Sequence, residues 1–152
     1  MNLTQILQLK SIKVPLEGKN KESAILELVD LLDSNGLLID RDKVLDAVLT
    51  REKTRSTGIG SGIAIPHGKC SSVRELVMAI GIADEPIDFQ GVDNKPVTII
   101  LLLLSPADQT GPHIQALASI SRLMLDEEFR QLLTKATSSE EVYKLINNKE
   151  NK

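Results

Sequence analysis

The N-terminal third of the chain contains two segments whose apolar residues recur at helical spacing. The first covers residues 20–35, where Asn20 is suited to the N-cap and Gly36 to a left-handed C-terminal cap. The second begins at Asp40 and ends near residues 51–53. Both segments are therefore predicted to be amphipathic helices, joined by a short turn.

The middle of the chain is dominated by extended apolar segments. "VTIILLLL", residues 97–104, is far shorter than the roughly 20 residues of a membrane helix, so it is predicted to be a strand buried on both faces. "ELVMAIGIA" at residues 75–83 is predicted to be a second strand. Shorter strands are expected for "SIKVPL" at residues 11–16 and "IAI" at residues 63–65, and residues 86–97 fit either strand or turn.

The C-terminal third is predicted to be helical again. Helices are expected from about His113 to residue 125, across residues 127–135, and from Ser139, where Ser138 and Glu141 have capping-box spacing. The polar tail, about residues 148–152, is expected to be frayed. Because helices and strands are interspersed and the best strands lie together, the pattern favours an α/β layer architecture in one domain spanning residues 1–152.

Composition and charge narrow the classes of function. Among 152 residues the net charge is -3, the 18 basic residues are scattered, and only one tyrosine and two phenylalanines are present. A nucleic-acid surface needs a basic face and often stacking aromatics, so nucleic-acid binding is set aside. Cys70, the one cysteine, permits no intrachain disulfide. The N-terminal residues lack the features of a signal peptide, and a cytoplasmic location is expected.

The stretch "TREKTRSTGIGSGIAIPHGK", residues 50–69, combines a glycine-rich segment with an imidazole that follows a proline. It does not have the spacing of a nucleotide-binding loop. Five residues separate Gly62 from Gly68 where a Walker loop has four, and cysteine replaces the hydroxyl residue after Lys69. The dinucleotide fingerprint also fails, because Gly58 and its neighbours have the spacing G-x-G-x-G.

The chain has only two histidines, His67 and His113, and each follows a proline and a glycine-containing segment. Free amides of a glycine-rich loop, and a helix start at His113, are typical of sites for anions such as a phosphoryl group. A zinc site would need distant carboxylates to complete it, and no G-x-S-x-G elbow supports a serine hydrolase. Cys70 is interpreted as an ordinary small residue rather than a nucleophile.

The two motif blocks resemble a known family. "LTREKTRSTGIGSGIAIPHGK" (residues 49–69) and "EPIDFQGVDNKPVTIILLLLSPADQTGPHIQALASISRLM" (residues 85–124) are similar to the enzyme IIA domains of the fructose–mannitol type in the bacterial phosphotransferase system. Within that type the chain most resembles the nitrogen-regulatory branch. The resemblance covers nearly the whole chain and is least specific in the first forty residues. It implies a mixed central sheet with helices on both faces.

The resemblance also implies roles for individual residues. His67 would accept a phosphoryl group from a histidine-phosphorylated carrier protein (HPr or its nitrogen-type counterpart), His113 would support that group, and Arg51 would position it. No metal or organic cofactor is implied. The unperturbed pKa of histidine, near 6.5, leaves a neutral nucleophile at pH 7. Amides of the glycine segment could stabilise the transferred charge, namely those of Ser56, Thr57, Gly58, Gly60 and Gly62.

Three functions remain open at this point. The first is a regulatory, nitrogen-type phosphocarrier whose downstream partner responds to phosphorylation of His67. The second is a sugar-specific enzyme IIA, for fructose or mannitol, that passes the phosphoryl group to a IIB domain. The third, of another class, is an anion-binding module that transfers nothing.

Overall fold

The apolar segment at the centre of the chain forms the central strand of the sheet. In the computed structural model, which describes residues 1–151, this segment is β6 (Val97–Ser105), and every residue in it except Thr98 is buried. It pairs antiparallel with β5 (Val77–Ile87) along one edge. Along its other edge it pairs parallel with two short strands, β3 (Ile63–Ala64) and β4 (His67–Lys69). The predicted strand buried on both faces is confirmed.

Two further strands complete a six-stranded mixed sheet. β1 (Leu7–Leu16) runs parallel to β5, and β2 (Gly58–Gly60) runs antiparallel to β3. The order is β1-β5-β6-β3-β2, with β4 also paired to β6. The mixed sheet implied by the family resemblance is therefore confirmed. β1 begins four residues before the predicted segment 11–16, and neither β2 nor β4 was predicted to be a strand.

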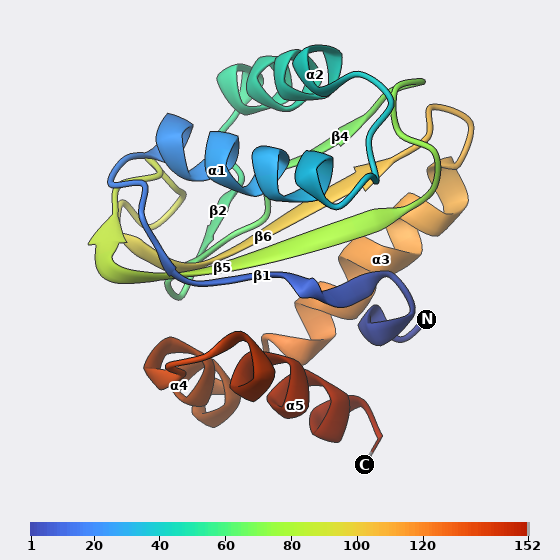
Figure 1. Ribbon diagram of the computed structural model, residues 1–152. Helices are drawn as coiled ribbons and strands as arrows, with labels where there is room; N and C mark the ends of the chain where they lie inside the picture. Colours follow the sequence, from blue (N-terminus) through green and yellow to red (C-terminus); the bar gives the residue numbers. More distant parts are fainter. Residues whose placement is uncertain (152) are drawn as a thin grey trace.

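Helices cover both faces of this sheet (Figure 1). α1 (Lys21–Ser34) and α2 (Arg41–Thr54) bury their apolar stripes against one face. The other face carries α3 (Thr110–Leu123), α4 (Glu127–Lys135), α5 (Ser139–Glu150) and the short helix η1 (Leu3–Gln5). Within residues 1–151, no helix has both the length and the apolar composition needed to cross a bilayer.

The predicted ends of the first two helices are confirmed. Asn20 Oδ1 accepts a hydrogen bond from the Ser23 amide at 2.9 Å, and Gly36 has a φ of 76°. Asp40 caps α2 by accepting from two amides of its first turn. These polar side chains satisfy amide groups that have no partner inside the helix, which explains why the helices begin there.

Two details at the helix ends differ from the predictions. α3 begins at Thr110, so the His113 amide already donates to the Gln109 carbonyl at 3.1 Å and is not a free helix-terminal donor. Ser138 caps α5 as predicted, but the Glu141 carboxylate accepts from the Thr137 amide instead of the cap residue.

The predicted fraying of the tail is wrong for residues 148–150, which belong to α5. The Glu150 carboxylate accepts hydrogen bonds from the amides of Leu3 and Thr4 and from the Thr4 hydroxyl. These contacts join the last turn of α5 to η1 and stabilise the end of the helix. Residue 152 lies outside the described residues.

Replacement of Gly81 by alanine is expected to destabilise the protein, because a Cβ at this position in β5 would lie 2.6 Å from Leu16 Cδ2. Overpacking of this kind costs about 1–3 kcal/mol of unfolding free energy. Gly111→Ala is the matched control, since no atom lies within 4 Å of its added Cβ. Urea denaturation measures both variants, and equal stabilities would contradict the packing described here.

Candidate functional site

β4 places His67 on the face of the sheet that α3 covers. His67 is in register with Leu103 of β6, and Leu103 belongs to the apolar cluster on the α3 side. Paired residues of neighbouring strands point to the same face, so the imidazole does too. The next residue, Gly68, faces α2, where an added Cβ would lie 3.3 Å from Val48 Cγ2. Glycine therefore allows β4 to lie close against α2.

The hydrogen bond of His67 determines its tautomer. Nδ1 lies 2.8 Å from the Ile65 carbonyl oxygen. Because a carbonyl only accepts, Nδ1 carries the proton and Nε2 carries the lone pair. Nε2 has no hydrogen-bond partner among the described residues. Every buried side-chain nitrogen or oxygen of these residues does have a partner, so Nε2 is not buried. The nucleophilic nitrogen therefore reaches the molecular surface.

The structure brings the second histidine next to the first. The rings of His67 and His113 have centroids 5.4 Å apart and planes inclined at 59°. His113 is only 5% exposed, and its Nδ1 lies 2.7 Å from the hydroxyl of Ser105, the last residue of β6. The two imidazoles thus come from β4 and α3 and meet at the end of the central strand.

Both histidines are neutral at pH 7. Burial lowers the pKa of His67 from 6.5, and the charge of Arg51 lowers it further, whereas the Ile65 carbonyl and Glu52 act in the opposite direction. The pKa of His113 is lowered to about 4, mainly by burial and then by the neighbouring His67 and Lys69. A neutral His67 keeps the lone pair that nucleophilic attack requires.

Arg51 lies beside His67, at the last turn of α2. Its Nη1 donates to the Arg55 carbonyl at 2.7 Å, which holds the guanidinium near the end of the helix. Arg51, Arg55 and His67 line one cleft of about 320 Å³. The remaining lining residues are Ser56, Thr57, Gly58, Ile59, Ile65, Val92, Leu117 and Ser121. Cationic and apolar side chains therefore surround the imidazole.

The glycine segment is a β-hairpin rather than an open loop. β2 and β3 pair antiparallel, and Ser61 and Gly62 turn the chain with φ values of 57° and 79°. Gly60 and Gly62 lie in or next to this turn and do not line the cleft. The amides of Thr57 and Gly58 already donate to the Glu52 carboxylate and the Ser56 hydroxyl. Stabilisation of phosphate by these amides stays a prediction.

Glu52 lies next to the site and was not predicted from the sequence. Its side chain is buried in α2 and accepts hydrogen bonds from the amide and hydroxyl of Thr57 and from Lys21 Nζ, which lies 2.9 Å away. Glu52 thereby fixes the segment that leads from α2 into β2. A signal was present in the sequence, because Glu52 continues the buried stripe of Val44 and Val48 at intervals of four residues.

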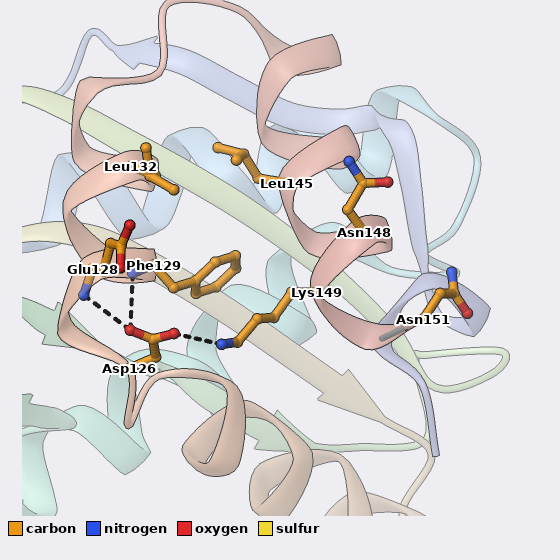
Figure 2. A pocket seen from close by; sticks show the side chains of 8 residues that line it. All are labelled: Asp126, Glu128, Phe129, Leu132, Leu145, Asn148, Lys149 and Asn151. Carbon is orange, nitrogen blue, oxygen red and sulfur yellow. Dashed lines mark hydrogen bonds and ion pairs between the residues drawn. The ribbon is translucent and has the colours of Figure 1, made fainter.

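Another groove, of about 520 Å³, lies between α4 and α5 (Figure 2). In Figure 2, Phe129, Leu132 and Leu145 supply its apolar side chains. Asp126 accepts from the Phe129 amide and pairs with Lys149 Nζ at 2.5 Å. Neither histidine lines this groove. The two imidazoles therefore lie in a separate site, near the end of β6.

The pKa values lead to a prediction for NMR titration. We expect His113 to protonate with a pKa of about 4, and His67 with a pKa below the ordinary 6.5. Below pH 6.5 the unfolded chain binds more protons than the folded chain, so stability should fall as the pH decreases toward 4. A His113→Gln variant assigns the two signals, and a midpoint for His113 near 6.5 would contradict the buried site.

Comparison with known proteins identifies the family. Residues 5–149 match the family model described as "Phosphoenolpyruvate-dependent sugar phosphotransferase system, EIIA 2". The chain is 36% identical over 153 residues to the nitrogen regulatory protein of Escherichia coli, covering 99% of this chain and 92% of that protein. It is 37% identical over 147 residues to the fructose-specific EIIABC component of Bacillus subtilis, but covers only 23% of that longer protein.

A solved structure agrees with this assignment. The crystal structure of the nitrogen regulatory protein IIA-Ntr from Neisseria meningitidis superposes with a TM-score of 0.85 at 33% identity, covering 93% of this chain and 97% of that one. The chain therefore belongs to the EIIA type 2 family of the phosphoenolpyruvate-dependent sugar phosphotransferase system.

Proposed function

We propose that the protein accepts a phosphoryl group on Nε2 of His67 from a histidine-phosphorylated carrier protein, HPr or its nitrogen-type counterpart. The observation that supports this most directly is the hydrogen bond from Nδ1 of His67 to the Ile65 carbonyl at 2.8 Å. It fixes the proton on one ring nitrogen and leaves the other as the nucleophile. Such a carrier would act in the cytoplasm, where we place this protein.

The transfer exchanges one nitrogen–phosphorus bond for another. The lone pair on Nε2 of His67 attacks phosphorus, and the bond from phosphorus to the donor histidine breaks, with its electron pair returning to the donor nitrogen. Positive charge that develops on the His67 ring is shared with Nδ1–H, which donates to the Ile65 carbonyl. The protein therefore contributes mainly positioning and electrostatic stabilisation.

Arg51 and His113 are the groups best placed to stabilise the transferred charge. Arg51 lines the same cleft as His67, and the His113 ring lies 5.4 Å from the His67 ring. Guanidinium groups match the geometry of phosphoryl oxygens, so Arg51 can position the group for in-line attack. We assign His113 to the support of a phosphoryl oxygen.

We further propose a regulatory, nitrogen-type role. The nitrogen regulatory protein of Escherichia coli is matched along 92% of its length. Phosphorylation of His67 would add up to two negative charges to a cleft that now carries Arg51 and Arg55. A charge change of that size can create or abolish docking of a downstream protein.

A sugar-specific enzyme IIA is the second candidate. It is favoured by the fructose-specific EIIA component of Haloferax volcanii, which is 36% identical over 95% of this chain and 94% of that protein. The chemistry at His67 would be the same, but the phosphoryl group would then pass to a IIB domain. Transfer assays with a fructose or mannitol IIB domain distinguish the two candidates.

The test of the proposed function is phosphorylation by phosphoenolpyruvate, enzyme I and either carrier type. We expect the intact mass to increase by one phosphoryl group, the modification to be lost in acid, and NMR to show phosphorus on Nε2 of His67. Phosphorylation at another residue, or no phosphorylation with either carrier, would refute the proposal. In the latter case an anion-binding module becomes the preferred interpretation.

A further inference from the structure

Ser105 places a single hydroxyl at the inner edge of the site. It is the last residue of β6 and is fully buried. Its carbonyl accepts the Cys70 amide at 3.1 Å, and its Cα pairs in register with Lys69 of β4. The hydroxyl oxygen lies 2.7 Å from Nδ1 of His113. Backbone pairing thus holds this hydroxyl in a fixed position relative to the α3 histidine.

The direction of this hydrogen bond follows from which groups can accept a proton. Nδ1 of His113 is the one partner recorded for the Ser105 hydroxyl among residues 1–151. A buried hydroxyl proton without an acceptor costs about 1–3 kcal/mol. If Ser105 accepted a proton from Nδ1, its own proton would have no acceptor within these residues. The hydroxyl therefore donates, and Nδ1 accepts.

A neutral imidazole that accepts at Nδ1 carries its proton on Nε2. Nε2 of His113 has no hydrogen-bond partner among the described residues. Since every buried side-chain nitrogen or oxygen of these residues has a partner, Nε2 of His113 reaches the surface. We infer that Ser105 is a positioning residue for phosphoryl transfer, which orients His113 so that its Nε2–H donates to the phosphoryl group carried by His67. This inference rests on the proposed function.

The arrangement assigns opposite tautomers to two adjacent histidines. The Ile65 carbonyl holds the proton of His67 on Nδ1, which leaves Nε2 as the nucleophile. The Ser105 hydroxyl donates to the lone pair on Nδ1 of His113, which leaves Nε2–H of that ring as a donor. One ring can therefore attack phosphorus while the other stabilises its oxygens, although both rings are neutral.

The first test is nitrogen-15 NMR of the unphosphorylated protein at pH 7, which does not depend on activity. We expect Nε2 of His113 to carry the proton and Nδ1 to show the shift of a hydrogen-bonded acceptor. In Ser105→Ala, the Nδ1 signal should move to the position of an unbonded nitrogen. A proton on Nδ1 in the wild-type protein, or an unchanged Nδ1 signal in the variant, would overturn the inference.

The second test measures the rate of phosphoryl acceptance. Loss of one hydrogen bond of ordinary strength in Ser105→Ala should slow acceptance about 5- to 10-fold. Ser119→Ala is the control, since this buried serine of α3 donates instead to the Met1 carbonyl at 2.8 Å. We expect that control to keep the wild-type rate.

A double variant separates positioning from a general loss of structure. If Ser105 acts through His113, Ser105→Ala should slow acceptance no further once His113 is alanine. Equal slowing in both backgrounds would overturn the inference. If wild-type protein accepts no phosphoryl group at all, the proposed function fails, whereas the nitrogen-15 spectrum still decides whether Ser105 donates to His113.

Discussion

With His67 replaced by alanine, we expect the protein to accept no phosphoryl group. The side chain supplies the attacking lone pair, and its Nε2 is the free nitrogen of the ring that the Ile65 carbonyl orients. Arg51 and His113 would remain, but neither can replace the nucleophile, because an arginine stays charged and the Nε2 of His113 carries a proton when its Nδ1 accepts from Ser105. Intact mass after incubation with phosphoenolpyruvate, enzyme I and the carrier measures the loss.

Two controls accompany this experiment. His113→Ala should still be phosphorylated, at a rate lower by about 100-fold or more, the usual cost of removing one donor to a developing charge. Thermal unfolding of both variants checks that the fold is retained. His67→Gln tests the anion-binding alternative, since a simple anion site would tolerate this change. Phosphorylation of His67→Ala at the wild-type rate would refute the assignment.

Replacement of Glu52 by alanine is expected to lower the free energy of unfolding by about 3–5 kcal/mol, the usual cost of breaking a buried ion pair. Glu52 is 6% exposed and accepts from Thr57 and from Lys21. Its removal leaves the Thr57 amide and hydroxyl without their acceptor, and the partly buried Lys21 ammonium without its counter-charge. Urea denaturation followed by circular dichroism measures the effect.

Asp46→Ala is the matched control for Glu52→Ala, because Asp46 is an exposed carboxylate on the same helix. We expect it to change the stability by less than about 0.5 kcal/mol. Glu52→Gln should fall between the two, since an amide oxygen can still accept from Thr57. A stability for Glu52→Ala equal to that of the control would mean that the buried network contributes nothing.

The elements that depend on a local pattern could be predicted from the amino-acid sequence alone. An apolar segment of eight residues was sufficient to predict β6, and the caps at Asn20 and Ser138 were recognisable because helix ends need specific side chains. The resemblance carried by residues 49–69 and 85–124 indicated the family, which the comparison confirms. Arg51, His67 and His113 were predicted as site residues, and the structure brings them together.

The interactions between these residues could be found only in the folded protein. β2 and β4 have only three residues each, too few to show a periodicity, and β4 pairs with β6, which is distant in the sequence. The proton on Nδ1 of His67 follows from a hydrogen bond to the Ile65 carbonyl, and the role inferred for Ser105 follows from its 2.7 Å distance to His113. A buried polar atom must find its hydrogen-bond partner within the protein. The tautomers of the histidines and the partners of the Glu52 carboxylate therefore depend on which groups the fold removes from water.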